Sequence, residues 1–232
     1  CYEYLQGETL AQWLHRQEKP LNLDEILPIL QQTALALNAM HRLEMLHQDI
    51  RPKNIMVINA ENAMKIKLID YGSTAVRGLV EINPKNANRA LGTLAFMAPE
   101  YFIDHSPSVH SDQFSLAVMA YYLFTKQLPY GTDLARCNSL KQMKKVQYHS
   151  IRKYRPDLPI WLDKILGQAL SIEPIHRFEA LSELIHNLMH PSKELLNSKP
   201  PAIIERDPLR FWQMSCAVLG LLFLLSIAWP FI

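Results

Sequence analysis

The chain has 232 residues, 49% of them hydrophobic, so it is long enough for a domain with a substantial core and an additional segment. Its formal net charge of +2 and the lack of a dense basic stripe argue against a nucleic-acid-binding protein. The three cysteines, Cys1, Cys137 and Cys216, form neither a C-x-x-C pair nor a disulfide framework, which favours a reducing compartment.

The first residues, CYEYLQGETL, are typical of the end of a strand followed by a turn. The chain has no initiating methionine and no signal peptide. Because a protein rarely starts in the middle of a strand, we expect an N-terminal portion to precede residue 1.

Regular elements are predicted next along the chain. Apolar residues recur at three- and four-residue spacings over 24–41, which predicts a helix. Asn22 and Glu25 have the spacing of a capping box at its start. The runs NIMVIN and KIKLID flank residues 60–63 and predict a small hairpin.

The second half of the chain is predicted to be mainly helical. Residues 73–98 have few apolar repeats and several asparagines, so a loop is expected there. The run SDQFSLAVMAYYLFTKQLPYG is apolar on nearly all sides and predicts a buried central helix, capped by Ser111 and ended by Pro129. Further helices are expected over 160–170 and 178–188.

The C-terminal segment differs in composition from the rest of the chain. Residues 191–209 are polar and contain prolines, which indicates a linker. Residues 211–232 carry no charge and, at about 1.5 Å per residue, are long enough to cross a bilayer. With Trp212 and Trp229 near its ends, this run predicts a single transmembrane helix over residues 210–232, the alternative being a buried core helix.

The polar stretch HQDIRPKN, residues 47–54, is the first candidate for chemistry. Taken alone, His47 is more often a packed core histidine, and Asp49 could equally cap a helix or close a turn. Three further signals follow at fitting distances: LIDYGS, which places Asp70 at a strand end, then GTLAFMAPE, and later ALSIEPIHRF. Their order and spacing resemble the C-terminal lobe of a protein kinase over residues 1–190.

This resemblance implies roles in phosphoryl transfer, which depends mainly on positioning and charge neutralisation. Asp49 matches the residue that accepts the proton of the substrate hydroxyl, and Arg51 matches the lysine that contacts the γ-phosphate. Thr93 matches the threonine that bridges these two side chains, which implies serine or threonine as the acceptor. Asn54 and Asp70 match the ligands of Mg²⁺, and both supply oxygen donors.

The resemblance also implies how ATP is bound. The residues YEYL at positions 2–5 match the hinge, where backbone groups of Glu3 and Leu5 would contact adenine. Met56 would lie under the base.

Structural roles are implied for six further residues. His47 and Tyr71 would stack, with Gly72 next to them, and Asp112 would hold the backbone of the catalytic loop. Glu100 and Arg177 would form a buried ion pair.

The kinase pattern also requires a glycine-rich loop and a strand lysine, and neither is found in these residues. Two readings therefore stay open: a serine/threonine kinase lobe whose nucleotide lobe precedes residue 1, or a pseudokinase-like scaffold that only binds. The intact Asp49, Asn54 and Asp70 favour the kinase. The chain by itself is not expected to transfer phosphate efficiently.

Gln48 departs from the pattern, because kinases that bind a phosphate on the activation loop carry arginine at this position. Glutamine lacks the positive charge for such a pair. Residues 75–92 contain no serine, threonine or tyrosine, so the acceptor site is missing as well. We therefore expect activity without phosphorylation in the middle of that loop.

A closer resemblance is to bacterial proteins that fuse a PP2C-type phosphatase to a serine/threonine kinase with a C-terminal membrane anchor. It rests on HQDIRPKN, GTLAFMAPEYF and the final DPLRFWQ that enters the apolar tail. It implies ATP and Mg²⁺ as cofactors, a protein substrate, and a membrane location with the kinase lobe in the cytoplasm. Lys193, Lys199, Arg206 and Arg210 precede the apolar run and nothing charged follows it, which favours the same orientation.

Overall fold

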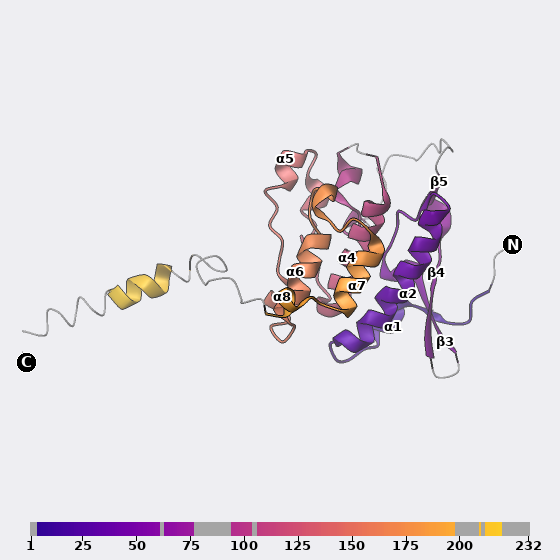
Figure 1. Cartoon of the computed structure of the whole chain (residues 1–232), viewed down its shortest axis with the longest axis horizontal. Helices are drawn as coiled ribbons and strands as arrows, with labels where there is room; N and C mark the ends of the chain where they lie inside the picture. Colours follow the sequence, from indigo (N-terminus) through magenta and orange to yellow (C-terminus); the bar gives the residue numbers. More distant parts are fainter. Residues whose placement is uncertain are drawn as a thin grey trace, which may run out of the picture. The chain divides into compact units, whose positions relative to one another are not determined.

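The computed structural model of the chain describes residues 4–60, 63–76, 94–103, 106–197, 209 and 212–219. It consists of two units, Cys1–Leu196 and Asn197–Ile232. The first unit is rich in helices and carries two small sheets (Figure 1).

The strands form two small antiparallel sheets. One has the order β1-β3-β4 and consists of Glu8–Thr9, Ile55–Ala60 and Ala63–Leu68. The other pairs β2, Met45–Leu46, with β5, Ala75–Val76. The predicted hairpin is therefore confirmed as β3–β4, whereas the loop expected from residue 73 begins with a short strand. β5 forms because β2, a few residues before Asp49, supplies the hydrogen-bonding edge with which it pairs.

The N-terminal strand lies later than expected. Residues 1–3 are outside the described part of the chain, residues 4–6 have no regular structure, and the strand is Glu8–Thr9, where a turn was predicted. A strand of two residues is too short to show a hydrophobic period in the sequence, so it could not be predicted. Its backbone is extended because it pairs with β3. Gly7 allows this pairing, because a side-chain carbon on it would overlap the Val57 carbonyl oxygen.

Helices are the main regular elements of the first unit and are labelled in Figure 1. Their bounds are α1 Leu10–His15, α2 Leu23–Arg42, α4 Val109–Thr125, α5 Leu140–Met143, α6 Ile160–Ala169, α7 Leu181–Met189 and α8 Lys193–Leu196. Short 3-10 helices connect them, including η1 Pro52–Asn54, η2 Tyr71–Ser73 and η3 Pro99–Phe102.

Helix α2 agrees with its sequence signals. The side chain of Asn22 accepts from the Glu25 backbone at 3.0 Å, and the Glu25 carboxylate accepts from the Asn22 backbone at 2.8 Å. This capping box satisfies two donors that a helix start leaves unpaired. Pro28 lies in the second turn and is tolerated, and the helix packs against α4, α7 and β4.

Helix α4 begins and ends earlier than predicted. Its N-cap is Ser108, which accepts from the His110 backbone at 3.2 Å, so the prediction of Ser111 as the cap is wrong. Ser111 is the third residue of the helix, and its hydroxyl accepts from the Ser108 backbone and donates to Glu100. The helix ends at Thr125, before Lys126 in the left-handed conformation, so Pro129 does not end it.

The last two large helices are slightly shorter than predicted. α6 matches 160–170 within one residue, whereas α7 starts at Leu181 instead of 178. Phe178 is buried, and its carbonyl oxygen accepts from the Gln113 side chain at 3.1 Å. That contact with α4 holds residue 178 outside the helix.

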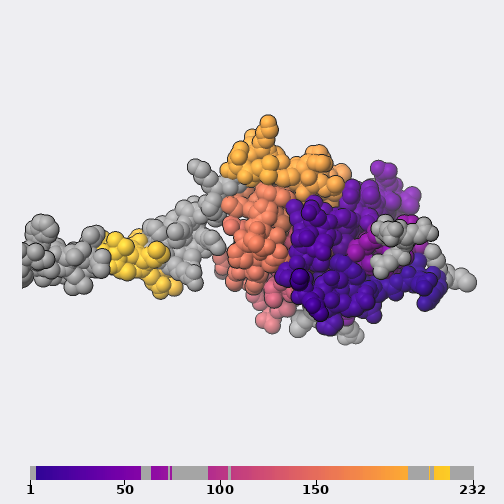
Figure 2. Space-filling view, turned by 90° about the horizontal axis from the view of Figure 1, so that it is seen from below, coloured from indigo at the N-terminus to yellow at the C-terminus, as the bar shows by residue number. Residues whose placement is uncertain are grey.

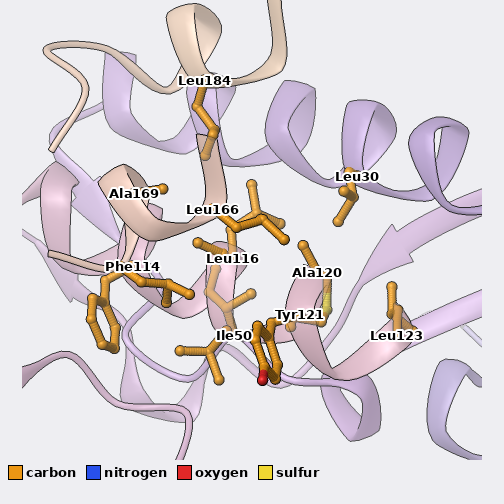
Figure 3. Close-up of a cluster of buried hydrophobic side chains, with 14 of the residues drawn as sticks. Leu30, Ile50, Phe114, Leu116, Ala120, Tyr121, Leu123, Leu166, Ala169 and Leu184 are labelled. Atoms are coloured by element: carbon orange, nitrogen blue, oxygen red, sulfur yellow. The ribbon is translucent and has the colours of Figure 1, made fainter. Parts of the chain in front are cut away.

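The core is centred on α4, which is buried almost all round. Figure 3 shows Leu116 of this helix between Ile50 and Leu166, with Tyr121 beside Ile50. In Figure 2 the indigo N-terminal part lies directly against the salmon segment near residue 155, and Arg155 donates to the Leu21 carbonyl at 3.1 Å. The first sixty residues and the later helices therefore share one core.

The C-terminal part was expected to be a linker and a transmembrane helix. The expected linker includes α8, whose residue Leu195 packs against the core. Residues 212–219 are helical, and most of the expected span, 220–232, lies outside the described residues. Within the ranges that the structure covers, no helix has both the length and the apolar character needed to cross a bilayer.

Replacing Gly7 by alanine is expected to destabilise the first unit by about 1–3 kcal/mol, because the added methyl group would push β1 away from β3. Urea unfolding monitored by circular dichroism measures the change. Gly167→Ala is the matched control, since its methyl group would meet only the Tyr148 ring at 3.7 Å and helix propensity would rise. Equal stability of Gly7→Ala and the unchanged protein would contradict the prediction.

Candidate functional site

The site is organised by a buried carboxylate, Asp112, in the first turn of α4. One of its oxygens accepts from the His47 backbone at 3.0 Å and lies 2.8 Å from His41 Nε2. The other accepts from the Gln48 backbone at 2.9 Å. Hydrogen bonds to an ionised group are about twice as strong as neutral ones, so this carboxylate fastens the loop of residues 47–54 to α4.

Gln48 adopts a left-handed backbone conformation, with φ of 65°. For a residue other than glycine this costs roughly 1–2 kcal/mol, and the bond from its N–H to Asp112 offsets that cost. The Gln48 side chain is buried. The loop therefore reverses direction sharply, just before Asp49.

The position of Asp49 is fixed by a buried neighbouring residue and by two polar side chains that contact its carboxylate. Ile50, the next residue, is 1% exposed and lies in the core beside α4 (Figure 3). Asn54 Nδ2 donates to the Asp49 backbone oxygen at 2.8 Å and to its carboxylate at 2.7 Å. Arg51 Nε lies 3.8 Å from the other carboxylate oxygen. The Asp49 side chain is thus fixed in position and stays 14% exposed.

Asn54 and Asp70 lie at the same end of the β3–β4 hairpin. Asn54 ends η1 directly before β3, Asp70 follows β4, and the Ile69 N–H donates to the Asn54 carbonyl at 2.9 Å. Because its amide nitrogen faces Asp49, the side-chain oxygen of Asn54 points away from that residue. Asp70 is exposed, and its φ of 65° is supported by a bond from Gly72 N–H to its carboxylate at 3.3 Å.

The rings of His47 and Tyr71 are 5.8 Å apart and tilted by 54°. The Tyr71 hydroxyl donates to the Leu68 carbonyl at 3.2 Å, which provides the partner that a tyrosine needs at this position. Burial lowers the pKa of His47, although the nearby carboxylates of Asp112, Asp49 and Asp70 partly oppose this effect. His47 is therefore a neutral packing residue.

Glu100 and Arg177 form a buried pair at the other end of the site. Two guanidinium nitrogens donate to the two carboxylate oxygens at 2.9 Å, and Ser111 donates to one of these at 2.7 Å. Burial by itself would raise the pKa of Glu100, but the bonds and charge of Arg177 outweigh it and the pKa is lowered. Arg177 also donates to the carbonyl oxygens of Ser171, Ile172 and His110.

The structure brings together only part of the predicted site. Asp49, Arg51 and Asn54 are in mutual contact, Asp70 and Tyr71 follow the adjacent strand, and Asp112 supports them. Glu3 and Thr93 lie outside the described residues. Leu5 and Met56, predicted to contact adenine, are half-buried, and Met56 pairs with Thr9 in the sheet.

Sequence reasoning missed His41, which shares the Asp112 carboxylate with the loop. A histidine in the last turn of a helix is normally explained by the helix dipole, so the sequence carried no sign of this contact.

The donor set fits a hard divalent cation. Asn54 and Asp70 supply oxygen atoms, and a cation such as Mg²⁺ needs few protein ligands when a phosphate supplies the others. No group of three or more histidine, cysteine, aspartate or glutamate side chains suited to a metal occurs among the residues that the structure describes.

Comparisons with known proteins agree with this geometry. The family model described as protein kinase domain matches residues 1–191. The serine/threonine-protein kinase PrkC of Bacillus subtilis is 26% identical over 182 residues, which cover 78% of this chain and 27% of PrkC. The serine/threonine-protein kinase pkn3 of Myxococcus xanthus is 31% identical over 180 residues, which cover 75% of this chain and 32% of that protein.

A solved structure is similar as well. The crystal structure of the Mycobacterium tuberculosis PknI kinase domain has a TM-score of 0.60 and 25% identity, covering 81% of this chain and 63% of that domain. The chain thus spans about a third or less of the length of the two curated relatives named above.

The buried, neutral His47 is expected to make stability depend on pH. Its folded-state pKa is lowered, so below about pH 6.5 the unfolded chain binds a proton that the folded chain does not. The free energy of unfolding should therefore fall as the pH drops through 6.5, by up to about 1.4 kcal/mol per pH unit from this residue.

Urea unfolding between pH 5 and 8 tests this expectation, with His47→Phe as the comparison because phenylalanine keeps a flat ring beside Tyr71. The other histidines contribute equally to both proteins. If both proteins lose stability in parallel, His47 is not the source of the pH dependence.

Proposed function

The chain belongs to the protein kinase family, and from this we propose that it provides the acceptor-binding lobe of a serine/threonine kinase. Such a kinase transfers the γ-phosphate of ATP to a hydroxyl group of a protein. The observation that carries the proposal is the fixed Asp49 carboxylate, held by Asn54 and placed by the bonds from the loop backbone to Asp112.

In this proposal Asp49 binds the acceptor hydroxyl, orients its oxygen and accepts its proton. Arg51, near the same carboxylate, neutralises charge on the transferred phosphate. Arginine keeps the positive charge of the lysine that it replaces, but its planar group contacts oxygen atoms in pairs. Thr93 would join these two side chains and favour serine or threonine acceptors.

Asn54 and Asp70 would hold Mg²⁺, which neutralises the phosphates of ATP and draws them into position when it is bound. Backbone groups of Glu3 and Leu5 would contact adenine, and Met56 would pack under it. What supports the metal assignment is the direction of the Asn54 amide, which leaves its oxygen facing away from Asp49.

Activity without phosphorylation in the middle of residues 75–92 is part of the proposal. Gln48 is buried and held by its backbone, and it carries no charge that would attract a phosphate. The absence of hydroxyl side chains from residues 75–92 supports the same conclusion.

We also propose that the protein is anchored in a membrane through residues 210–232, with the kinase lobe in the cytoplasm. The support comes from the sequence: 22 uncharged residues at positions 211–232, and Lys193, Lys199, Arg206 and Arg210 before them. A fused PP2C-type phosphatase upstream of residue 1 is the arrangement that the motif resemblance favours.

Asp49→Asn in the full-length gene product is expected to abolish phosphate transfer while the protein stays folded, because asparagine keeps the shape but cannot accept the proton. Labelling of a generic serine/threonine substrate with γ-³²P-ATP measures the activity, and thermal unfolding checks the fold. A decrease of at least about a hundredfold is expected.

Two controls accompany this assay. Asp157→Asn changes an exposed aspartate that pairs with Arg155, and it should leave the activity unchanged. Chelation of divalent cations should stop the unchanged enzyme, and added Mg²⁺ should restore it. Near-normal labelling by Asp49→Asn would disprove its role, and a folded full-length protein that binds ATP but never transfers phosphate would favour the scaffold.

Deleting residues 210–232 is expected to move the protein from the membrane fraction to the supernatant, because the uncharged run is removed with its interfacial tryptophans. Fractionation of cells measures this, and protease added outside intact cells should leave the kinase lobe undigested. A truncated protein that still sediments with membranes would refute the anchor, and digestion from outside would refute the orientation.

A further inference from the structure

A small hollow lies between helix α1 and the C-terminal end of α4. It has a volume of about 140 Å³ and is lined by Ala11, Leu14, His15, Tyr122 and Lys126. Its lining exposes both polar and apolar surface, and no carboxylate belongs to it. None of the proposed catalytic or metal-binding residues lines it either, so the hollow is separate from the site around Asp49.

The polar atoms of the hollow are mainly donors. The Lys126 ammonium group donates to the Gln17 carbonyl at 3.2 Å, which fixes one of its three hydrogens and leaves two for another acceptor. Lys126 has a φ of 53° at the end of α4, so its backbone is held in one conformation. His15 is exposed at the end of α1 and adds a ring N–H donor.

The remaining residues that line the hollow surround these donors. The Tyr122 ring is 5.6 Å from Phe96 and tilted by 71°, an edge-on contact that orients its hydroxyl. Ala11 and buried Leu14 supply an apolar surface suited to one or two methylene groups. A short side chain that ends in a carboxylate matches this combination in size and in charge.

Helix α1 links the hollow to the candidate acceptor site. The carboxylate that precedes α1, Glu8, is paired with Arg16. Helix α1 also packs against η1, which carries exposed Lys53 and ends at Asn54, the partner of Asp49. The hollow therefore shares one helix with the element that holds Asp49.

We propose that this hollow binds an acidic side chain of the protein substrate, and that the enzyme thereby prefers acceptor hydroxyls with aspartate or glutamate nearby. This inference rests on the proposed kinase function. A basic substrate residue would be disfavoured in the hollow, because it would meet Lys126 and His15 without a carboxylate to pair with.

The test uses the full-length gene product and two serine peptides that differ only by aspartate or asparagine at positions flanking the serine. The ratio of their kcat/KM values is expected to be about five or more, as one ion pair near a surface provides. Lys126→Gln should bring this ratio towards one, and Lys126→Glu should invert it. Lys145→Gln, at an exposed lysine beside α5, is the matched control and should leave the ratio unchanged.

Direct binding of the same peptides, measured by fluorescence anisotropy, separates this inference from the proposed function. Acid-preferring binding that Lys126→Gln removes, without any phosphate transfer, would support the hollow and reject the kinase activity. Transfer to both peptides at equal rates would overturn the hollow and keep the kinase. Capture of anionic lipid vesicles through Lys126, with no peptide preference, would overturn it too.

Discussion

The buried carboxylate of Asp112 is the interaction on which the arrangement of the site depends. It lies in the first turn of the central helix α4, where the helix dipole favours a negative charge, and it accepts from two successive backbone N–H groups of the loop that carries Asp49. His41 brings α2 to the same carboxylate. A buried charge is stable only when such partners surround it, so the loop, α2 and α4 hold one another in place. The left-handed turn at Gln48 persists because these contacts over-determine it.

A buried ion pair also ties distant segments of the unit to α4. Glu100 and Arg177 are separated by 77 positions in the sequence and meet through two hydrogen bonds, with Phe114 of α4 against the guanidinium group at 4.8 Å. Removing one partner would leave a buried charge unpaired, at a cost of about 3–5 kcal/mol. The arginine also binds three backbone carbonyls, so the segment after α6 is tied to the first turn of α4. Both networks converge on the first turn of this helix, where Ser111 and Asp112 lie buried.

Acidic and basic side chains lie in different regions around the candidate acceptor site. Asp49 and Asp70 carry the carboxylates that the proposed function assigns to the acceptor and the metal, whereas Lys53 and Lys126 lie on the neighbours of α1. In that proposal, the separation of the two signs would let one side organise a cation and its phosphates while the other side attracts an acidic polypeptide. The anchoring of Ile50 in the core gives the short loop between these regions the rigidity that positioning requires (Figure 3).

The sequence alone determined the elements whose signals are local. The capping box at Asn22 and the periodicity after it predicted α2, and the alternating runs around residues 60–63 predicted the hairpin, because these patterns depend on neighbours a few residues apart. The resemblance of the motif around Asp49 implied that Asp49 and Asn54 belong to one site, and these two side chains, five positions apart, are in contact. Only the tertiary structure decided that Ser108 and not Ser111 caps α4, that Glu8–Thr9 forms a strand, and that His41 joins Asp112. Each of these depends on a partner far along the chain: Ser111 is bonded to Glu100, β1 needs the edge of β3, and His41 meets a carboxylate 71 positions away. Local sequence carries no record of such partners, because packing brings them together only once the core has formed.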